Sequence, residues 1–323
     1  MTAVVLCLPS VSLLESASLA DRKAEFPRLA WCLGAATRTP HTGPLEPMLA
    51  TRCGLDPAAA LAQITARYDL GAVAAERDLL RCDPIHLHAD PNKVLVYGPA
   101  NLDLSAADAD ALIAAVQREF PALNCVRGTS PQRWYIVRPP DVGGSAPSTQ
   151  WLNARSITPF MPLAAAQRSW RRWLNDLQMV LHEQPVNQAR EARGLLPVNG
   201  VWWFGAGVPP HATPCAFTQL IGNDAVLAGI AAHTQIPWSA HAAPALPPCG
   251  ATLVVAGAAF GEAQAGDVIS LPEIETTWLP RLVNAVRRRR ITSLTLLTAT
   301  HSVHLNWFQS WHTWHAPQSF ILE

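Results

Sequence analysis

Apolar runs and amphipathic segments alternate along this chain, and their order predicts a mixed α/β protein. In the C-terminal half, three short apolar runs predict buried strands, and the segments between them predict helices. These runs are Val201–Phe204, Thr252–Ala256 and Ser293–Thr298. Strands that alternate with helices favour a largely parallel, doubly wound sheet. The apolar run Val4–Leu8 predicts a first buried strand of this α/β core.

The block from Arg81 to Arg138 has a different order of elements. Its pattern predicts two strands, a helix capped by Ser105 and two more strands, which indicates a small α+β unit. The four predicted strands are Ile85–His88, Lys93–Tyr97, Leu123–Val126 and Trp134–Val137. We expect four parts: residues 1–75 as the first part of the core, 76–140 as the α+β unit, 141–195 as linker and amphipathic helices, and 196–323 as the remainder of the core.

Two further features refine this division. Pro139–Thr149 is rich in Pro, Gly and Ser and predicts a linker, and Leu163–Glu183 predicts an amphipathic helix. Asp56-Pro57 has the residue types that open a helix. If Trp170 and Trp173 of the amphipathic helix were exposed, that helix would be a docking face for a protein partner.

The composition of the chain argues against some classes of function. The 323 residues are 49% hydrophobic and have a formal net charge of +0, so no overall field attracts nucleic acid or an anionic membrane. The four arginines Arg287–Arg290 are interpreted as a solvated helix end. Seven cysteines without a Cys-x-x-Cys pair favour a reducing compartment, and no apolar run approaches the ~20 residues of a membrane helix. We therefore expect a cytoplasmic protein.

Gly205-Ala206-Gly207 follows a predicted strand, as phosphate-binding loops do. However, no P-loop Lys-Ser/Thr follows, and Pro209-Pro210 lack N–H donors. The alternative is a tight turn where the backbone passes close to a neighbouring segment. Because side chains alternate along a strand, one of Trp202 and Trp203 is expected in the core and the other beside a crevice.

Two histidine clusters have spacings that suit metal ligands. His86, His88 and Asp90 would share one face of a strand; the favoured alternative is a buried Asp83-Pro84 turn bound to backbone amides. Near the C-terminus, two His-x-x-His pairs would each share one face of a helix. Their alternative is an aromatic tail packed on the core. The histidines of these pairs are His301, His304, His312 and His315.

The segment around Pro197-Val-Asn199, the following apolar strand and Gly205-x-Gly207 resembles the archaeal-type cofactor-independent phosphoglycerate mutases of the alkaline-phosphatase superfamily. The resemblance implies an acidic metal ligand after the first strand, a Ser or Thr nucleophile, and a late Asp-His-Ser motif. Here the first strand is followed by Pro9-Ser10, and the late motif is Thr300-His301-Ser302. The resemblance therefore implies the backbone fold of the mutases without their metal-ligand residues.

A second resemblance covers nearly the whole chain. The chain is similar to the RpfE-type regulatory proteins, a bacterial family related to the mutases. The matching motifs are Asp83-Pro84-Ile85-His86-Leu87, Leu102-Asp103-Leu104-Ser105, Arg133-Trp134-Tyr135 and Pro197-Val-Asn199-Gly-Val-Trp202-Trp203-Phe204-Gly205-Ala-Gly207. This resemblance implies an alkaline-phosphatase-like, doubly wound α/β core with an inserted small α+β unit.

Three hypotheses of function follow. The first is a non-catalytic binding or regulatory protein without cofactor, whose partner is a small phosphorylated metabolite or a protein. Its ligand crevice would lie between core and insert, near Asp83, His86, Asn199, Trp202, Gly205, Gly207 and His301. The second is a metal-dependent phosphomutase or phosphatase with a rearranged site; it would use Asp83, His86, Glu262, Asp267 and His301, with Ser10 or Ser12 as nucleophile. The third is the docking scaffold described above.

Overall fold

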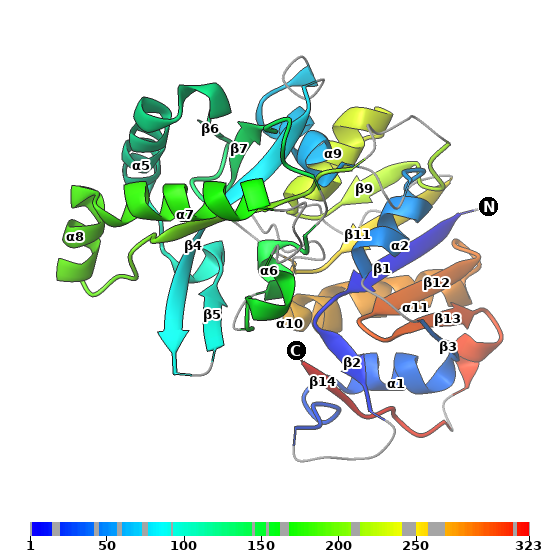
Figure 1. Cartoon of the computed structure of the whole chain (residues 1–323). Coiled ribbons are helices and arrows are strands. Elements are labelled where there is room, and N and C mark those ends of the chain that lie inside the picture. Colours follow the sequence, from blue (N-terminus) through cyan, green and yellow to red (C-terminus); the bar gives the residue numbers. More distant parts are fainter. Residues whose placement is uncertain are drawn as a thin grey trace. The chain divides into compact units, whose positions relative to one another are not determined.

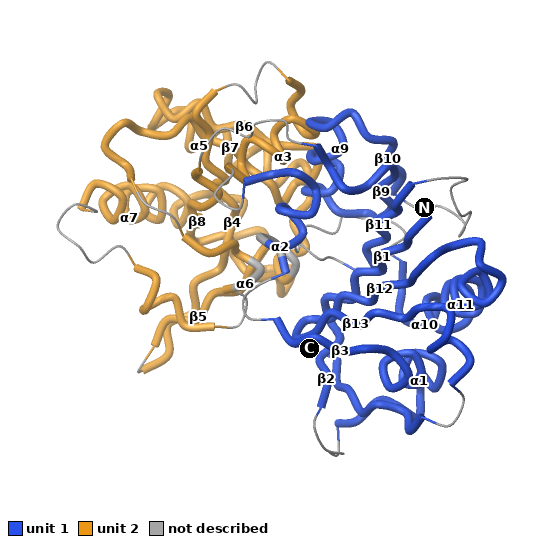
Figure 2. The backbone as a smooth tube through the Cα atoms, turned by 90° about the vertical axis from the view of Figure 1, so that its right-hand side faces the viewer, with its two compact units in different colours: residues 1–57, 211–323 blue, residues 58–210 orange. Residues whose placement is uncertain are grey.

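In the computed structural model the chain forms two compact units (Figures 1 and 2). Unit 1 comprises residues 1–57 and 211–323, and unit 2 comprises residues 58–210, which interrupt unit 1 in the sequence. The structure describes residues 2–14, 20–41, 45–56, 60–72, 77–91, 93–143, 146–152, 155–161, 168–207, 214–240, 250–257, 269–312 and 315–322. Within these ranges no helix combines the length and the hydrophobicity needed to cross a bilayer.

Unit 1 contains a mixed, mainly parallel sheet of seven strands in the order β10-β9-β11-β1-β12-β13-β3. The first five strands of this order are parallel, and β13 and β3 pair antiparallel at one edge. β14 and β2 form a separate antiparallel pair. The strands are β1 Ala3–Leu8, β2 Val11–Leu13, β3 Thr37–Pro40, β9 Gln219–Ile221, β10 Trp238–Ser239, β11 Ala251–Val255, β12 Ser293–Thr298, β13 His301–Asn306 and β14 Phe320–Leu322.

The strand β1 lies in the interior of this sheet. It pairs with β11 on one side and β12 on the other, and its residues from Val4 to Leu8 are buried. A parallel strand covered on both faces requires a continuous apolar sequence, and Val-Val-Leu-Cys-Leu supplies one. The predicted strands at Val4–Leu8, Thr252–Ala256 and Ser293–Thr298 are therefore confirmed, with small shifts at their ends.

Helices α1 and α11 of unit 1 contribute to one hydrophobic core with β1 and β12. The N-terminus of α1 has an unusual cap: the buried Glu275 accepts the N–H groups of Arg28 (2.8 Å) and Leu29 (2.9 Å). Glu275 belongs to a π-helical turn, Ile274–Trp278, between α10 and α11. The helices of unit 1 are α1 Pro27–Ala35, α2 Leu45–Arg52, α9 Ala225–Thr234, α10 Leu271–Glu273 and α11 Leu279–Arg287.

Unit 2 is an α+β unit whose long strand β4 pairs antiparallel with β5, β7 and β8, and β7 pairs with β6. Its strands are β4 Leu79–Asp90, β5 Lys93–Tyr97, β6 Val126–Arg127, β7 Trp134–Val137 and β8 Gly200–Phe204. Its helices are α3 Leu61–Asp69, α5 Ala106–Glu119, α6 Thr149–Leu152, α7 Arg168–His182 and α8 Pro185–Ala192. The predicted cap of α5 is confirmed, because Ser105 Oγ accepts the N–H of Asp108 (3.1 Å).

The assignment of Val201–Phe204 to the parallel sheet is wrong. This strand, β8, pairs antiparallel with β4 of unit 2, from Gly200 opposite Ile85 to Phe204 opposite Arg81. The run Val-Trp-Trp-Phe is apolar at every position because all its side chains are buried. Such a run is compatible with either sheet, so its pattern does not identify its partner. The division by contacts, at residues 57/58 and 210/211, accordingly differs from the expected boundaries.

Two local predictions in unit 2 are also wrong. Asp83-Pro84 is not a turn but lies inside β4, between segments 79–81 and 86–90, which pair with β7 and β5. Pro84 lies opposite Val201 of β8, and a proline is tolerated in a strand only where no ladder bond needs its N–H. Helix α3 begins at Leu61, with Ala60 as its N-cap, rather than at Asp56.

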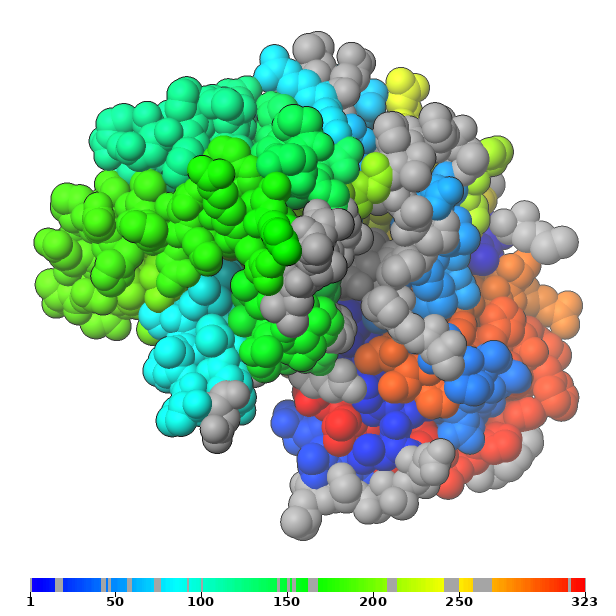
Figure 3. All heavy atoms as spheres, viewed as in Figure 1, coloured from blue at the N-terminus to red at the C-terminus, as the bar shows by residue number. Residues whose placement is uncertain are grey.

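Helix α7 confirms the amphipathic prediction from Arg168 onward. Its apolar side contributes Trp170, Leu174, Leu177 and Leu181 to the core of unit 2. In the space-filling view the green atoms of α7 form part of the surface of unit 2 on this side (Figure 3). Trp170 is only 4% exposed and Trp173 is partly buried against the same core. The docking-face hypothesis is therefore wrong, because the apolar side of this helix faces its own sheet.

A buried carboxylate ties three segments of unit 2 together. Asp69, at the end of α3, accepts two bonds from the Arg133 guanidinium (2.8 Å each), one from the Thr129 hydroxyl (2.5 Å) and one from the Tyr135 hydroxyl (2.6 Å). Burial by itself would raise the pKa of Asp69, but these bonds outweigh it and lower the pKa to about 2. The ionised form of Asp69 therefore stabilises the folded state.

This network predicts a pH dependence of stability. Because the folded pKa of Asp69 lies below the ordinary value of about 3.9, its contribution is present above about pH 4 and is lost as the pH falls toward 2. Asp69→Asn should lower the free energy of unfolding by about 2 kcal/mol at pH 7 and flatten its fall below pH 4. Urea unfolding followed by tryptophan fluorescence measures both effects.

The matched control is Asp110→Asn, since Asp110 also pairs with an arginine, Arg127 (2.6 Å), but is 57% exposed. Exposed pairs contribute little, so this variant should change stability by less than about 1 kcal/mol. Equal effects of the two substitutions on stability would contradict the stabilising role of the buried, ionised Asp69.

Candidate functional site

The carboxyl ends of the parallel strands of unit 1 meet at one edge of the sheet. Open α/β sheets bind ligands at this edge. β9 ends at Ile221, β11 at Val255 and β12 at Thr298, and β1 ends at Leu8 between β11 and β12. We call the segments that follow these strands the carboxyl edge: residues 9–10, 222–224, 256–257 and 299–301 (Figure 1).

Two histidines lie at the end of β12. Nε2 of His41 is 3.0 Å from Thr298 O, and the His41 N–H donates to Thr300 O (3.0 Å). Nδ1 of His301 is 2.9 Å from the Thr300 hydroxyl, and the His301 N–H donates to Thr298 Oγ1 (3.0 Å). Both histidines are partly exposed. This part of the edge therefore offers two imidazoles and a hydroxyl at the surface.

Two opposite charges lie near the end of β1. The buried Asp224 follows β9, and its Oδ1 accepts the N–H of Val226 (2.9 Å), so it caps α9. Arg52 is the last residue of α2. Burial raises the pKa of the Cys7 thiol on β1 far above its ordinary value; the charge of Asp224 adds to this effect and the charge of Arg52 opposes it. The charges of Asp224 and Arg52 thus act on Cys7 with opposite effects.

The described residues of the carboxyl edge do not fit the two-metal set that the mutase resemblance implies. β1 is followed by Pro9 and the exposed Ser10, and Ser12 is buried in β2. In the part of the chain that the structure describes, no three His, Cys, Asp or Glu side chains converge as a metal-binding group. Glu262 and Asp267, which the enzyme hypothesis requires, lie outside the described residues.

Of the expected ligand residues, only His301 belongs to unit 1; the other six belong to unit 2. Asp83 there accepts two bonds from Arg81, from Nε (2.9 Å) and Nη2 (2.7 Å), and one from the Thr149 hydroxyl (3.1 Å). The Arg81 guanidinium also lies over the rings of Tyr135 and Phe204, 5.5 and 5.1 Å from their centroids. These described bonds come from side chains, and the expected bonds of Asp83 to backbone amides stay a prediction.

His86 and Asn199 hold the strands of unit 2 in place. Nδ1 of His86 is 2.9 Å from Pro197 O. The Asn199 side chain accepts the N–H of Leu87 (2.7 Å) and donates to Leu87 O (3.0 Å), which extends the pairing of β8 with β4 beyond Gly200. Their role as ligand residues stays a prediction, while these bonds give both a structural role.

The expectation that one tryptophan of the Trp202-Trp203 pair lines a crevice is wrong. Both side chains are fully buried. Trp202 donates its Nε1–H to Pro147 O (2.9 Å), and Trp203 donates to Cys82 Sγ (3.0 Å). Each ring packs near a tryptophan of α7. Both side chains of the pair therefore belong to the core of unit 2.

Gly205 allows a close approach of two backbone segments. Its φ is +79°, and a Cβ atom built on it would lie 2.9 Å from the backbone nitrogen of Ala62. Its carbonyl accepts the N–H of Ala62 (3.1 Å) at the start of α3. This is the geometry of the tight turn, which was the alternative to a phosphate loop. Gly207 is exposed, and its expected ligand role stays a prediction.

Neither histidine cluster forms a metal group. The rings of His86 and His88 are 6.3 Å apart, which confirms a shared face, but they converge with no third ligand among the described residues. His301 and His304 lie on the strand β13, where residues three apart point to opposite faces. The helical arrangement expected for them is therefore wrong.

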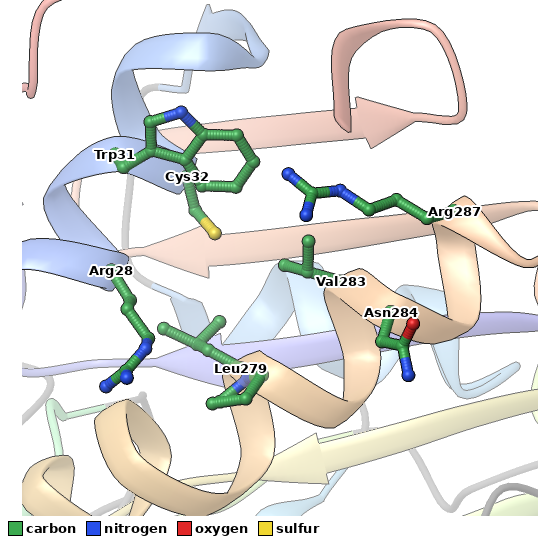
Figure 4. A pocket seen from close by; sticks show the side chains of 8 residues that line it. Arg28, Trp31, Cys32, Leu279, Val283, Asn284 and Arg287 are labelled. Atoms are coloured by element: carbon green, nitrogen blue, oxygen red, sulfur yellow. The ribbon is translucent and has the colours of Figure 1, made fainter. Parts of the chain in front are cut away.

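A cavity of about 450 Å³ lies on the helical side of unit 1, between α1 and α11 (Figure 4). Its wall is mostly apolar, and two guanidinium groups flank it. Arg287 lies over the rings of Trp31 and Trp311, and Arg28 is 3.8 Å from Glu275. The lining residues are Arg28, Trp31, Cys32, Leu279, Pro280, Val283, Asn284 and Arg287.

Sequence reasoning missed His41, Arg52 and Asp224. For Asp224 a signal existed, because Asn-Asp before an apolar helix is an N-cap pattern. His41 follows the exposed strand β3, and Arg52 ends a helix of low apolar periodicity, so no pattern marks either residue.

No family model and none of the curated proteins matches this chain. Solved structures that are similar to it include the following two. A cofactor-independent phosphoglycerate mutase from Thermoplasma acidophilum DSM 1728 is 12% identical, with a TM-score of 0.39, over 95% of this chain and 90% of that chain. The PH0037 protein from Pyrococcus horikoshii is 9% identical, with a TM-score of 0.46, over 94% and 87%. At these TM-scores neither similarity assigns an activity or a site to this chain.

The geometry of Gly205 predicts a graded effect of substitution. Gly205→Ala combines a left-handed backbone with a contact that a Cβ atom cannot occupy, so it should destabilise the protein by about 3 kcal/mol. Gly71 has a similar φ of +88° but nothing within 4 Å, so Gly71→Ala should cost only about 1 kcal/mol. Urea unfolding measures the free energy of unfolding of both variants. Equal losses of stability in the two variants would show that the close approach of Gly205 to Ala62 is unimportant.

Proposed function

We propose that this chain is a non-catalytic binding or regulatory protein that holds a small anionic metabolite, such as a phosphomonoester, at the carboxyl edge of unit 1. The observation that carries the proposal is the chemistry of that edge. It offers the imidazoles of His41 and His301 and the hydroxyl of Thr300, and the charge of Arg52 acts electrostatically on Cys7 of the interior strand β1. The buried carboxylate there, Asp224, caps a helix.

These groups suit an anion better than a metal ion. An imidazole and a hydroxyl donate hydrogen bonds to phosphate oxygens, and a guanidinium adds a charge-assisted bond. A site for two divalent cations needs several carboxylates or imidazoles in one place. The described residues supply no such group of three.

The sequence resemblance supplies the finer part of the proposal. From the motifs that resemble those of the RpfE-type proteins and the archaeal-type mutases, we infer a relative of the alkaline-phosphatase superfamily that lacks the metal and nucleophile set. A phosphorylated ligand would then be inherited from a mutase ancestor. On this proposal the protein acts in the cytoplasm, through its ligand or through a protein partner.

The alternative is a metal-dependent phosphoryl-transfer enzyme. It requires five side chains to meet at one site, with Ser10 or Ser12 as nucleophile. The five residues are Asp83, His86, Glu262, Asp267 and His301. The exposure of Ser10 favours it over the buried Ser12 in that role. Turnover of 3-phosphoglycerate or of an aryl phosphate in the presence of Mn²⁺ would establish this alternative.

Binding of phosphate probes tests the proposal. Isothermal titration calorimetry with 3-phosphoglycerate and with inorganic phosphate should detect binding to the full chain. His301→Ala should weaken it by about tenfold or more, because a hydrogen bond to a charged group is lost. The matched control is His304→Ala, since His304 is an exposed histidine on the same strand.

Two results would contradict the proposal. One is an equal loss of affinity in the two histidine variants, which would place the anion away from the carboxyl edge. The other is the absence of binding by either probe.

A further inference from the structure

Two segments of unit 1 bring a pair of cysteines together. Cys53 directly follows α2, and its N–H donates to Leu49 O (2.9 Å), so it continues the helical hydrogen bonding. Cys215 lies four residues before Gln219, where β9 begins. A hydrogen bond from the Ala216 N–H to the carbonyl of the residue before Cys53 (3.2 Å) fixes the two segments to each other beside both cysteines.

The two thiols differ in exposure and in acidity. Cys53 is fully buried, whereas Cys215 is partly exposed. The pKa of Cys215 is lowered to about 7 despite its burial, because the neighbouring Cys53 thiol and, more weakly, the Phe217 N–H (3.4 Å from Cys215 Sγ) stabilise its thiolate. The neighbouring Cys215, together with burial, raises the pKa of Cys53. Near neutral pH, Cys215 is thus the accessible thiolate.

We propose that Cys215 and Cys53 form a redox-active pair that reduces a hydroperoxide and closes a reversible disulfide. An accessible thiolate beside a resolving thiol is the arrangement that such chemistry needs. The pair includes neither histidine of the proposed ligand site, although Cys53 directly follows Arg52, and this inference does not depend on the identity of the ligand.

The reaction takes two steps. The Cys215 thiolate attacks one peroxide oxygen; the O–O bond breaks, the alkoxide leaves and takes up a proton, and Cys215 becomes a sulfenic acid. Cys53 then loses its proton and its sulfur attacks the Cys215 sulfur; the S–O bond breaks and the hydroxide leaves as water. Two thiols are oxidised by two electrons, and one hydroperoxide is reduced to an alcohol and water.

A second thiol pair in the same chain provides an internal control. The thiols of Cys82 and Cys125 of unit 2 also influence each other's ionisation, but both are buried. Burial raises the pKa of Cys82 well above its ordinary value. The two pairs share their chemistry and differ in access to solvent, so Cys82 and Cys125 should remain reduced under conditions that oxidise Cys53 and Cys215.

Peroxide treatment of the reduced full chain tests the proposal. After H₂O₂ is added and removed, free thiols are alkylated in denaturant and the digest is analysed by mass spectrometry, with a protease that cleaves between Cys215 and Cys249. We expect a Cys53–Cys215 cross-link that dithiothreitol reverses, and alkylated Cys82 and Cys125. Absence of the cross-link, or equal oxidation of the buried pair, would overturn the proposal.

Two further measurements separate chemistry from folding. In Cys53→Ser, which keeps a hydroxyl donor, Cys215 should stop at the sulfenic acid and be trapped by dimedone; no adduct would count against the proposal. In the unmodified protein, alkylation of Cys215 by iodoacetamide should have a midpoint near pH 7. At that pH its thiolate fraction would be about 15-fold that of an ordinary cysteine. A midpoint at or above about pH 8.5 would overturn the assignment of Cys215 as the reactive thiol.

Discussion

The need to neutralise every buried carboxylate is the constraint on which both units depend. An ionised carboxylate removed from water costs several kcal/mol unless a charge or several N–H groups compensate it. In unit 2, guanidinium groups bind Asp69 and Asp83. In unit 1, helix N-termini bind Asp224 and Glu275. These four acidic side chains hold helices and strands in place, and their oxygens are already engaged.

Because the buried carboxylates are used in this way, other side chains supply the exposed polar groups at the carboxyl edge of unit 1. The interior strand β1 is apolar through Leu8 because it is covered on both faces, and proline and serine follow it. The exposed chemistry of the edge comes instead from β12 and from His41 beside it. An edge of imidazoles and hydroxyls with one nearby arginine favours recognition of an anion over the activation of a phosphoryl group by metal ions.

Local sequence patterns correctly predicted those elements that depend only on residues close together in the sequence. The apolar run of β1 and the Ser105 cap of α5 are examples, since each needs only nearby sequence. The partner of β8 could not be predicted, because an all-apolar run fits a strand buried in either sheet. Of the candidate site, His301 was predicted from the resemblance of Thr300-His301-Ser302 to the late Asp-His-Ser motif of the mutases. The pairing of Cys53 with Cys215 depends on tertiary folding and leaves no mark in the sequence.

The most direct test of this account is the metal content of the purified protein, measured by mass spectrometry before and after incubation with Mn²⁺ and Zn²⁺ followed by desalting. If the buried carboxylates are engaged as described, the protein should retain far less than one equivalent of either metal. Retention of about two equivalents, the number in a two-metal phosphoryl-transfer site, would contradict the account.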